Sequence, residues 1–186
     1  VIVSAMTLRN DAARYGWVAI GLHWLVAVTV FALFGLGFYM VELGYYDPWY
    51  RAAPDLHRSV GLTLLAVAVA RMAWRAVSPP PALVANHRPW ENLGARLAHW
   101  GLLALLFTAL ISGYLISTAD GAGIQVFDLF EVPSLTGRQS GLEDSAGLVH
   151  YWSTWALVIL AGLHGLAALK HHFIDRDATL KRMLRP

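Results

Sequence analysis

The stretch 145–169, SAGLVHYWSTWALVILAGLHGLAAL, contains two histidines and no Asp, Glu, Lys or Arg. An α-helix needs about 20 mainly apolar residues to cross roughly 30 Å of bilayer hydrocarbon, and this stretch is longer. Ionisable side chains are costly at that depth, so those that occur there usually have a function. The sequence therefore predicts a transmembrane helix over about residues 146–171, with His150 and His164 as candidate functional residues.

The rest of the chain has the same apolar character. Of 186 residues, 57% are hydrophobic and 14% are charged, and the mean hydropathy is +0.50, which is too apolar for a soluble domain of this length. Two further uncharged runs cover 15–41 and 97–119, and a fourth is shorter but is flanked by arginines that can snorkel toward headgroups. We predict an all-α integral membrane four-helix bundle, a single domain over 1–186, with spans at about 17–40, 56–77, 96–118 and 146–171.

The distribution of positive charge predicts the orientation. Four crossings leave both termini on one side of the membrane, together with the connection between the second and third spans. That side carries 11 of the Lys and Arg residues, against three on the other side, which are Arg51, Arg58 and Arg138. The positive-inside rule then predicts cytoplasmic termini. The pI near 9.1 reflects this asymmetry, and we expect no binding to nucleic acid.

Two absences in the sequence limit the chemistry. The chain has no cysteine, which excludes disulfides, iron–sulfur clusters and covalent attachment of haem through Cys-x-x-Cys-His. The polar residues 1–16 precede an apolar stretch that is too long for a signal peptide and lacks a cleavage site of small residues. We therefore expect the first span to remain as a membrane anchor, and any haem to be held noncovalently.

Topology pairs the histidines by depth. His150 and His164 are fourteen residues apart, which places them about 21 Å apart along one helix and only about 40° apart around it. His23 lies near the cytoplasmic end of the first span, and His57 lies at the outer start of the second. Because the last span runs inward, His57 is level with His150, and His23 is level with His164. Each pair can supply the two axial ligands of a b haem.

A haem also needs open space beside each ligand. Residues three or four positions from a helical side chain lie on the same face. Around these four histidines such positions hold small residues, namely Ala19, Ala27, Gly61, Ala146, Gly147, Ala161, Ala167 and Ala168. His99 has Arg96, Leu102 and Leu103 at these spacings, which leaves less room for a porphyrin. We interpret His99 as a hydrogen-bonded packing residue or as a neighbour of a haem propionate or a quinone.

Two arginines are candidate partners of the haem propionates. Arg71 follows His57 by fourteen residues and so approaches the depth of the inner pair, where a buried guanidinium needs an anion. Arg58 could serve the outer haem in the same way. Ordinary snorkelling from a helix end explains each arginine equally well.

The histidines can also be interpreted without a haem. A single intramembrane histidine is often a hydrogen-bonded contact between helices. A zinc site wants three or four donors at one level, with Cys or carboxylate ligands that these spans lack. His171 and His172 follow the apolar part of the last span, and we interpret them as an interfacial helix end.

Several segments together resemble the bacterial cytochrome b561 family. They are Ile20-Gly21-Leu22-His23-Trp24, the fourteen-residue spacing of His57 and Arg71, Leu97-Ala98-His99, Gly162-Leu163-His164, Ala168 and His171-His172. The resemblance covers nearly the whole chain and implies a dihaem b-type cytochrome of the inner membrane, with His23, His57, His150 and His164 as the ligands. Relatives in this family include a superoxide oxidase that reduces ubiquinone, which makes that reaction the leading specific activity. The long outer loop 120–144 and the extended polar N-terminus depart from the family pattern.

Three classes of function follow from these patterns. The first is an oxidoreductase that carries electrons from a small periplasmic donor through two b haems to ubiquinone, for which His99, His87 and Glu91 are candidate proton donors. The second is a cytochrome b subunit that relays electrons for a partner dehydrogenase. The third, a haem-free transporter or scaffold, lacks the broken helices and mid-membrane carboxylates of transporters. In the outer loop, segment 124–130 suits a short interfacial helix or an extended strand, as a lid or a partner contact.

Overall fold

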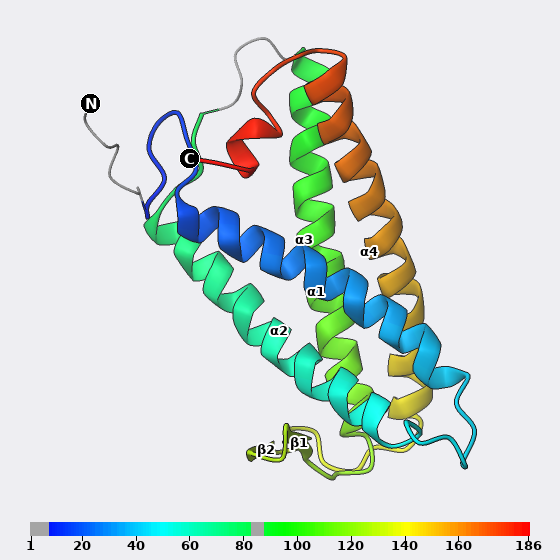
Figure 1. Cartoon of the computed structure of the whole chain (residues 1–186). Helices are drawn as coiled ribbons and strands as arrows, with labels where there is room; N and C mark the ends of the chain where they lie inside the picture. Colours follow the sequence, from blue (N-terminus) through cyan, green and yellow to red (C-terminus); the bar gives the residue numbers. More distant parts are fainter. Residues whose placement is uncertain (1–7, 83–87) are drawn as a thin grey trace. The chain divides into compact units, whose positions relative to one another are not determined.

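Four long helices and one small hairpin make up the computed structural model, which describes residues 8–82 and 88–186 (Figure 1). The elements are α1 (Trp17–Val41), α2 (Ala52–Val77), α3 (Pro89–Ser117), β1 (Ile124–Val126), β2 (Phe130–Val132), α4 (Leu142–Phe173) and the short 3-10 helix η1 (Lys181–Met183). All four long helices have the length and hydropathy needed to cross a membrane. The predicted all-α membrane fold is therefore confirmed.

The helices extend beyond the predicted spans at their polar ends. α3 begins at Pro89 instead of about residue 96, and α2 begins at Ala52 instead of about residue 56. Proline suits the first helical position because its missing N–H would have no intrahelical partner there. In the same turn the Glu91 carboxylate accepts the Arg88 backbone N–H at 2.9 Å, which caps the helix. Polar first turns thus continue helices past the hydrocarbon.

The chain divides into two compact units, and every long helix contributes to both. We call one the terminal unit; it comprises the described residues of Val1–Ala27, Val67–Gly101 and Ile159–Pro186. The other is the loop unit, Val28–Ala66 and Leu102–Val158. His57 and His150 belong to the loop unit. His23, His99 and His164 belong to the terminal unit.

The terminal unit is held together by its two polar tails. Asn10 donates its backbone N–H to Ser78 Oγ at 2.9 Å and its side-chain amide to the Ser78 carbonyl at 2.8 Å. The tail turns so tightly that a Cβ on Gly16 would clash with the Leu8 and Arg9 backbone. After α4 the chain returns to α1, where the Trp24 indole donates to the Met183 carbonyl at 2.7 Å.

The loop unit contains the antiparallel pair of β1 and β2, in which Ile124 lies opposite Val132. The Ser59 hydroxyl of α2 accepts the Phe127 backbone N–H at 3.0 Å and so ties the hairpin to the start of that helix. Ile124 and Val126 are buried, as alternation in a half-buried strand requires. Segment 124–130 is thus partly an extended strand, one of the two conformations predicted for it.

Protein packing fills little of the helical region. In each long helix, the most apolar 18-residue window has between 11% and 17% of its residues buried by the rest of the protein. Lipid covers the outward side chains of such helices, since bilayer chains are as apolar as Leu. The low burial is therefore the exposure expected of helices that face lipid.

Candidate functional site

In the loop unit, His57 of α2 and His150 of α4 face each other. Their ring centroids are 6.2 Å apart, and the ring planes are inclined by 75°. Metal–imidazole nitrogen distances are about 2 Å, so an iron held between two imidazoles would separate the ring centroids by roughly 6 Å. The pair thus has the spacing that two axial ligands of one haem require.

The orientation of the His150 ring is fixed by the backbone of α3. Its Nδ1 lies 2.8 Å from the Ala109 carbonyl oxygen, and only a protonated Nδ1 can bond to that acceptor. The Nε2 atom then carries a lone pair and is available to a metal. Metal-binding histidines are commonly oriented by such a bond from the other ring nitrogen.

Glycines from neighbouring helices give the two rings their space. A Cβ on Gly113 of α3 would lie 3.1 Å from His150 Cε1, and one on Gly37 of α1 would lie 3.5 Å from His57 Cε1. Sequence reasoning looked for small residues on each histidine's own helix and missed these two. His57 Nδ1 is buried and has no partner in the described part of the chain. These features fit a b haem in the loop unit.

Arg58, a predicted propionate partner, already has bonding partners at the start of α2. Its guanidinium pairs with Asp55, and its Nε donates to the Pro54 carbonyl at 3.3 Å. Both partners belong to the same helix turn. In this position Arg58 stabilises the first turn of α2.

In the terminal unit, three histidines and one arginine form a second cluster. A guanidinium nitrogen of Arg71 lies 3.1 Å from His23 Nδ1. The His99 and His164 ring centroids are 5.1 Å apart, with planes inclined by 66°. His23 is within electrostatic range of both His99 and His164. The predicted inner pair therefore shares one cluster with Arg71, and His99 lies closer to a predicted ligand than the sequence suggested.

The hydrogen bond between Arg71 and His23 constrains the imidazole. Arginine can only donate, so His23 Nδ1 accepts this bond and the proton of a neutral ring is on Nε2. A ring that binds iron through Nε2 needs the opposite arrangement. The same residues can hold a haem after Arg71 moves to an anionic group, as a propionate offers.

The other polar residues singled out in the sequence lie outside both clusters. His87 falls outside the described residues. His171 Nδ1 lies 2.7 Å from an Asp175 carboxylate oxygen at the end of α4, and Glu91 accepts a bond from Lys170 at 3.0 Å. His172 packs edge-on against Phe173, with ring centroids 4.8 Å apart.

Comparison with known proteins identifies the family. The model of the prokaryotic cytochrome b561 family matches residues 14–186. The chain is 49% identical over 179 residues to "Cytochrome b561 homolog 2" of Escherichia coli K12, covering 96% of this chain and 95% of that protein. It is 31% identical over 177 residues to "Probable superoxide oxidase CybB" of Yersinia pestis, covering 92% and 96%, and 25% identical over 178 residues to "Cytochrome b561 homolog 1" of E. coli K12, covering 92% and 97%.

The matches span the segments that carry both histidine clusters. They agree with four helices that are long and apolar enough to span a membrane. They also account for the absence of cysteine, because a b-type haem is held by side-chain ligands without a covalent bond. The chain belongs to the prokaryotic cytochrome b561 family of multi-pass bacterial membrane proteins, which transfer electrons by means of b-type haem.

Proposed function

We propose that this protein carries electrons across the bacterial inner membrane through two b haems, with superoxide at the periplasmic face as donor and ubiquinone in the bilayer as acceptor. His57 and His150 hold one haem, and His23 and His164 hold the other. Both termini are cytoplasmic, which follows from the charge asymmetry and the positive-inside rule.

The observation that carries this proposal is the His57–His150 pair. Two imidazoles from different helices lie at ligand spacing, and the backbone carbonyl of Ala109 sets the tautomer of one of them. A pair of axial ligands needs this spacing, and it needs the ring proton of His150 on Nδ1, so that Nε2 carries the lone pair. Haem is a cofactor that uses this arrangement.

Each haem, when bound, supplies reversible one-electron chemistry. The protein residues do the rest. The histidines would hold the metal, and the glycines of the neighbouring helices leave room for the imidazole rings of His57 and His150. Arg71 brings a positive charge to the terminal-unit cluster, where it can neutralise a propionate.

The choice of donor is supported by the Yersinia protein, which is named a probable superoxide oxidase and is 31% identical to this chain. A small anion is also compatible with Arg51, Arg58 and Arg138, the three cations predicted for the outer side, which can attract it. Ubiquinone suits the other end because it dissolves in the bilayer and can approach the helices from the side.

The first test is a difference spectrum of the purified protein, dithionite-reduced minus air-oxidised, combined with haem quantification as the pyridine haemochrome. We expect two b haems per chain with a bis-histidine α band. A single haem per chain would show that one of the two ligand pairs is wrong. A protein without haem would overturn the proposal. Superoxide-driven reduction of a ubiquinone analogue then tests the donor and the acceptor.

A second candidate function is favoured by the apolar surface of the hairpin. The side chains of Phe127, Leu129, Phe130 and Leu135 are exposed in the structure. Exposed apolar clusters on a loop often contact another protein. As a cytochrome b subunit, the chain would relay electrons for a partner redox subunit docked there. A dehydrogenase that copurifies in equal amounts, and is lost on Leu129→Asp, would favour this function over superoxide oxidation.

A further inference from the structure

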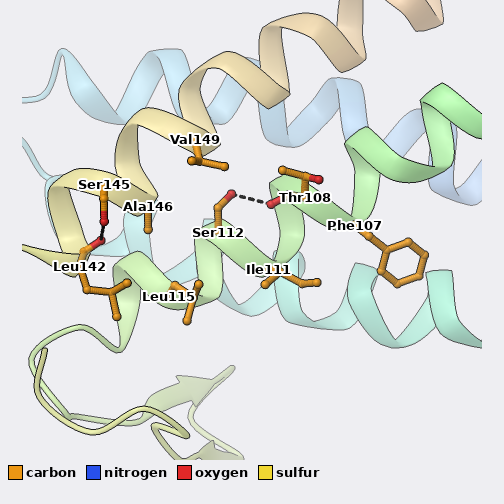
Figure 2. Close-up of a pocket in the computed structure, with 9 residues that line it drawn as sticks. All are labelled: Phe107, Thr108, Ile111, Ser112, Leu115, Leu142, Ser145, Ala146 and Val149. Carbon is orange, nitrogen blue, oxygen red and sulfur yellow. Dashed lines mark hydrogen bonds between the residues drawn. The ribbon is translucent and has the colours of Figure 1, made fainter.

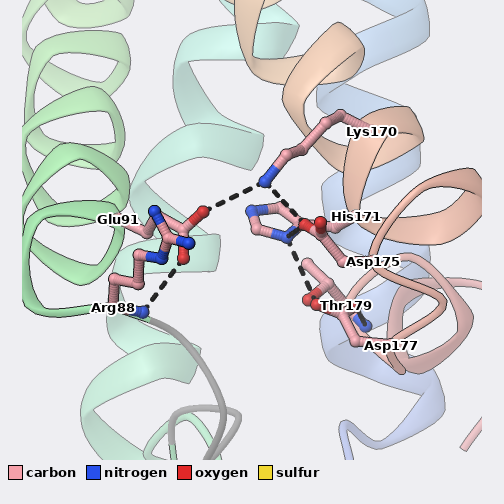
Figure 3. Close-up of polar contacts among 7 residues, drawn as sticks. All are labelled: Arg88, Glu91, Lys170, His171, Asp175, Asp177 and Thr179. Atoms are coloured by element: carbon pink, nitrogen blue, oxygen red, sulfur yellow. Dashed lines mark hydrogen bonds and ion pairs between the residues drawn. The ribbon is translucent and has the colours of Figure 1, made fainter.

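A polar network at the ends of α3 and α4 lies outside both histidine clusters. Figure 3 shows Lys170 between two carboxylates, with its Nζ 3.0 Å from Glu91 Oε1 and 2.7 Å from Asp175 Oδ2. The same Asp175 oxygen lies 2.7 Å from His171 Nδ1, which is also 3.2 Å from Asp177 Oδ2. These contacts form one continuous chain of five titratable groups.

Three of the five side chains in this network are largely shielded from water. Glu91, His171 and Asp177 are 13%, 14% and 12% exposed, whereas Lys170 and Asp175 are 42% and 33% exposed. Backbone groups hold the carboxylates in place, because Arg88 N–H donates to Glu91 at 2.9 Å and Thr179 N–H donates to Asp177 at 2.7 Å. Desolvating several charges is costly, and joining two helix ends would need only one ion pair. The extra groups therefore call for a role besides stability.

The network lies on the same helix faces as the terminal-unit cluster. His171 follows His164 by seven residues of α4, which is two helical turns and about 10 Å along the axis. Asn92 precedes His99 by seven residues of α3, and its Oδ1 is buried without a partner in the described chain. Seven residues return a helix to nearly the same face. His171 and Asn92 thus lie on nearly the same helix faces as His164 and His99, two turns further along each helix.

We propose that the network of Glu91, Lys170, His171, Asp175 and Asp177 delivers the protons for quinone reduction at the terminal-unit end of the protein. This inference rests on the proposed function, because it needs a quinone as acceptor. Ubiquinone gains two electrons, which the haem passes singly, and two protons, and it leaves as the quinol. The network supplies both protons to the quinone oxygens and takes replacements from the aqueous phase. His171 and Glu91 can each hold and pass a proton.

A bound metal ion is the competing explanation for the cluster. Donor atoms of Glu91, His171 and Asp175 lie within 4.8 Å of one another, close enough for one cation. The Lys170 ammonium already occupies the position between the two carboxylates and would repel a second cation. The structure therefore favours proton transfer, and it also indicates how zinc at sufficient concentration could displace Lys170 and block the path.

The experiment compares two oxidants of the haem-loaded, dithionite-reduced protein in rapid mixing. A short-chain ubiquinone needs protons, whereas ferricyanide takes an electron alone. We expect His171→Gln and Glu91→Gln to slow oxidation by the quinone by about 100-fold, the scale of positioned acid–base groups, and to leave oxidation by ferricyanide within about twofold. His172→Gln is the matched control, since this adjacent histidine is not part of the network, and it should behave like the unsubstituted protein.

Other results would overturn the relay. Equal slowing with both oxidants would mean that the substitutions damage the haem site, and unchanged rates with both would mean that protons enter elsewhere. If the unsubstituted protein is oxidised by ferricyanide and not by quinone, the acceptor in the proposed function fails, and the relay fails with it. Zinc should inhibit the quinone reaction alone, and His171→Gln should weaken that inhibition; zinc that affects both oxidants equally would contradict the assignment.

Discussion

The two histidine clusters differ in how their imidazoles are held. In the loop unit, His150 donates from Nδ1 to the Ala109 carbonyl, which leaves Nε2 ready to bind a metal. In the terminal unit, His23 accepts at Nδ1 from Arg71, which places the proton of a neutral ring on Nε2. In the first site, the backbone thus arranges one of the two imidazoles for a ligand role. The second needs an anion to draw Arg71 away, so its formation is coupled to the binding of its cofactor.

The largest effect should come from removing one imidazole of the loop-unit pair. We expect His150→Ala to lower the haem content from two per chain to about one, because the variant lacks one of the two axial ligands of the loop-unit haem. His164→Ala should do the same to the other site. Haem quantification measures both. Retention of two haems in either variant would show that the ligand pairs are wrong.

A smaller but specific effect should follow from filling the space beside His150. A Cβ on Gly113 lies 3.1 Å from His150 Cε1, so Gly113→Val should push the ring out of position and reduce occupancy of the loop-unit haem. Gly162→Val is the matched control, because nothing lies within 4 Å of a Cβ there. Redox titration separates the two haems. Equal losses in both variants would point to a general cost of valine in these helices.

The midpoint potentials of the two haems test the contrast between Arg71 and Arg58. Removing the Arg71 charge favours the oxidised form of the nearby haem, so Arg71→Gln should lower one midpoint potential by on the order of 60 mV, the shift that corresponds to about 1.4 kcal/mol for one electron. Arg58→Gln should change the other potential less, because Arg58 is paired with Asp55. A larger shift in the Arg58 variant would reverse the comparison.

The smallest effect concerns the hairpin. Ser59→Ala removes the acceptor of the Phe127 N–H and should cost about 1 kcal/mol of stability while leaving the haem content unchanged. Thermal unfolding followed by haem absorbance gives the change in Tm, and limited proteolysis reports opening of the loop. Thr63→Ala, one turn further along α2, is the control. Loss of haem in the Ser59 variant would show that the hairpin shapes the loop-unit site directly.

The sequence predicted the four long helices well, for a physical reason, whereas the haem-ligand pairs stay a prediction. Hydrocarbon thickness sets the length of a span, and helix periodicity sets which residues share a face, so both follow from spacing alone. Segment 124–130 was predicted less sharply, because Phe127 and Asp128 adopt positive φ values of 49° and 57°, which sequence patterns rarely indicate for such residues.

Contacts between distant segments were beyond prediction from spacing. Nothing in the pattern shows that Gly113 lies against His150, or that Lys170 reaches Glu91 across 79 positions of sequence. Ring tautomers depend on single carbonyl and guanidinium positions, as His150 and His23 illustrate. A pocket of about 420 Å³ also lies between α3 and α4, and its lining includes Ser112, whose hydroxyl donates to the Thr108 carbonyl at 2.6 Å (Figure 2).

The bond from His150 to Ala109 has a consequence for the cell's supply of haem. Under the proposed function, the loop-unit site binds haem at a lower cost in free energy, because the tautomer of His150 is already set. In the terminal-unit site, Arg71 must first leave His23. When haem is scarce, the loop-unit site would fill first, giving a population with a single haem. Such molecules would accept an electron and have nowhere to send it, so iron limitation would switch the pathway off before the protein itself disappeared.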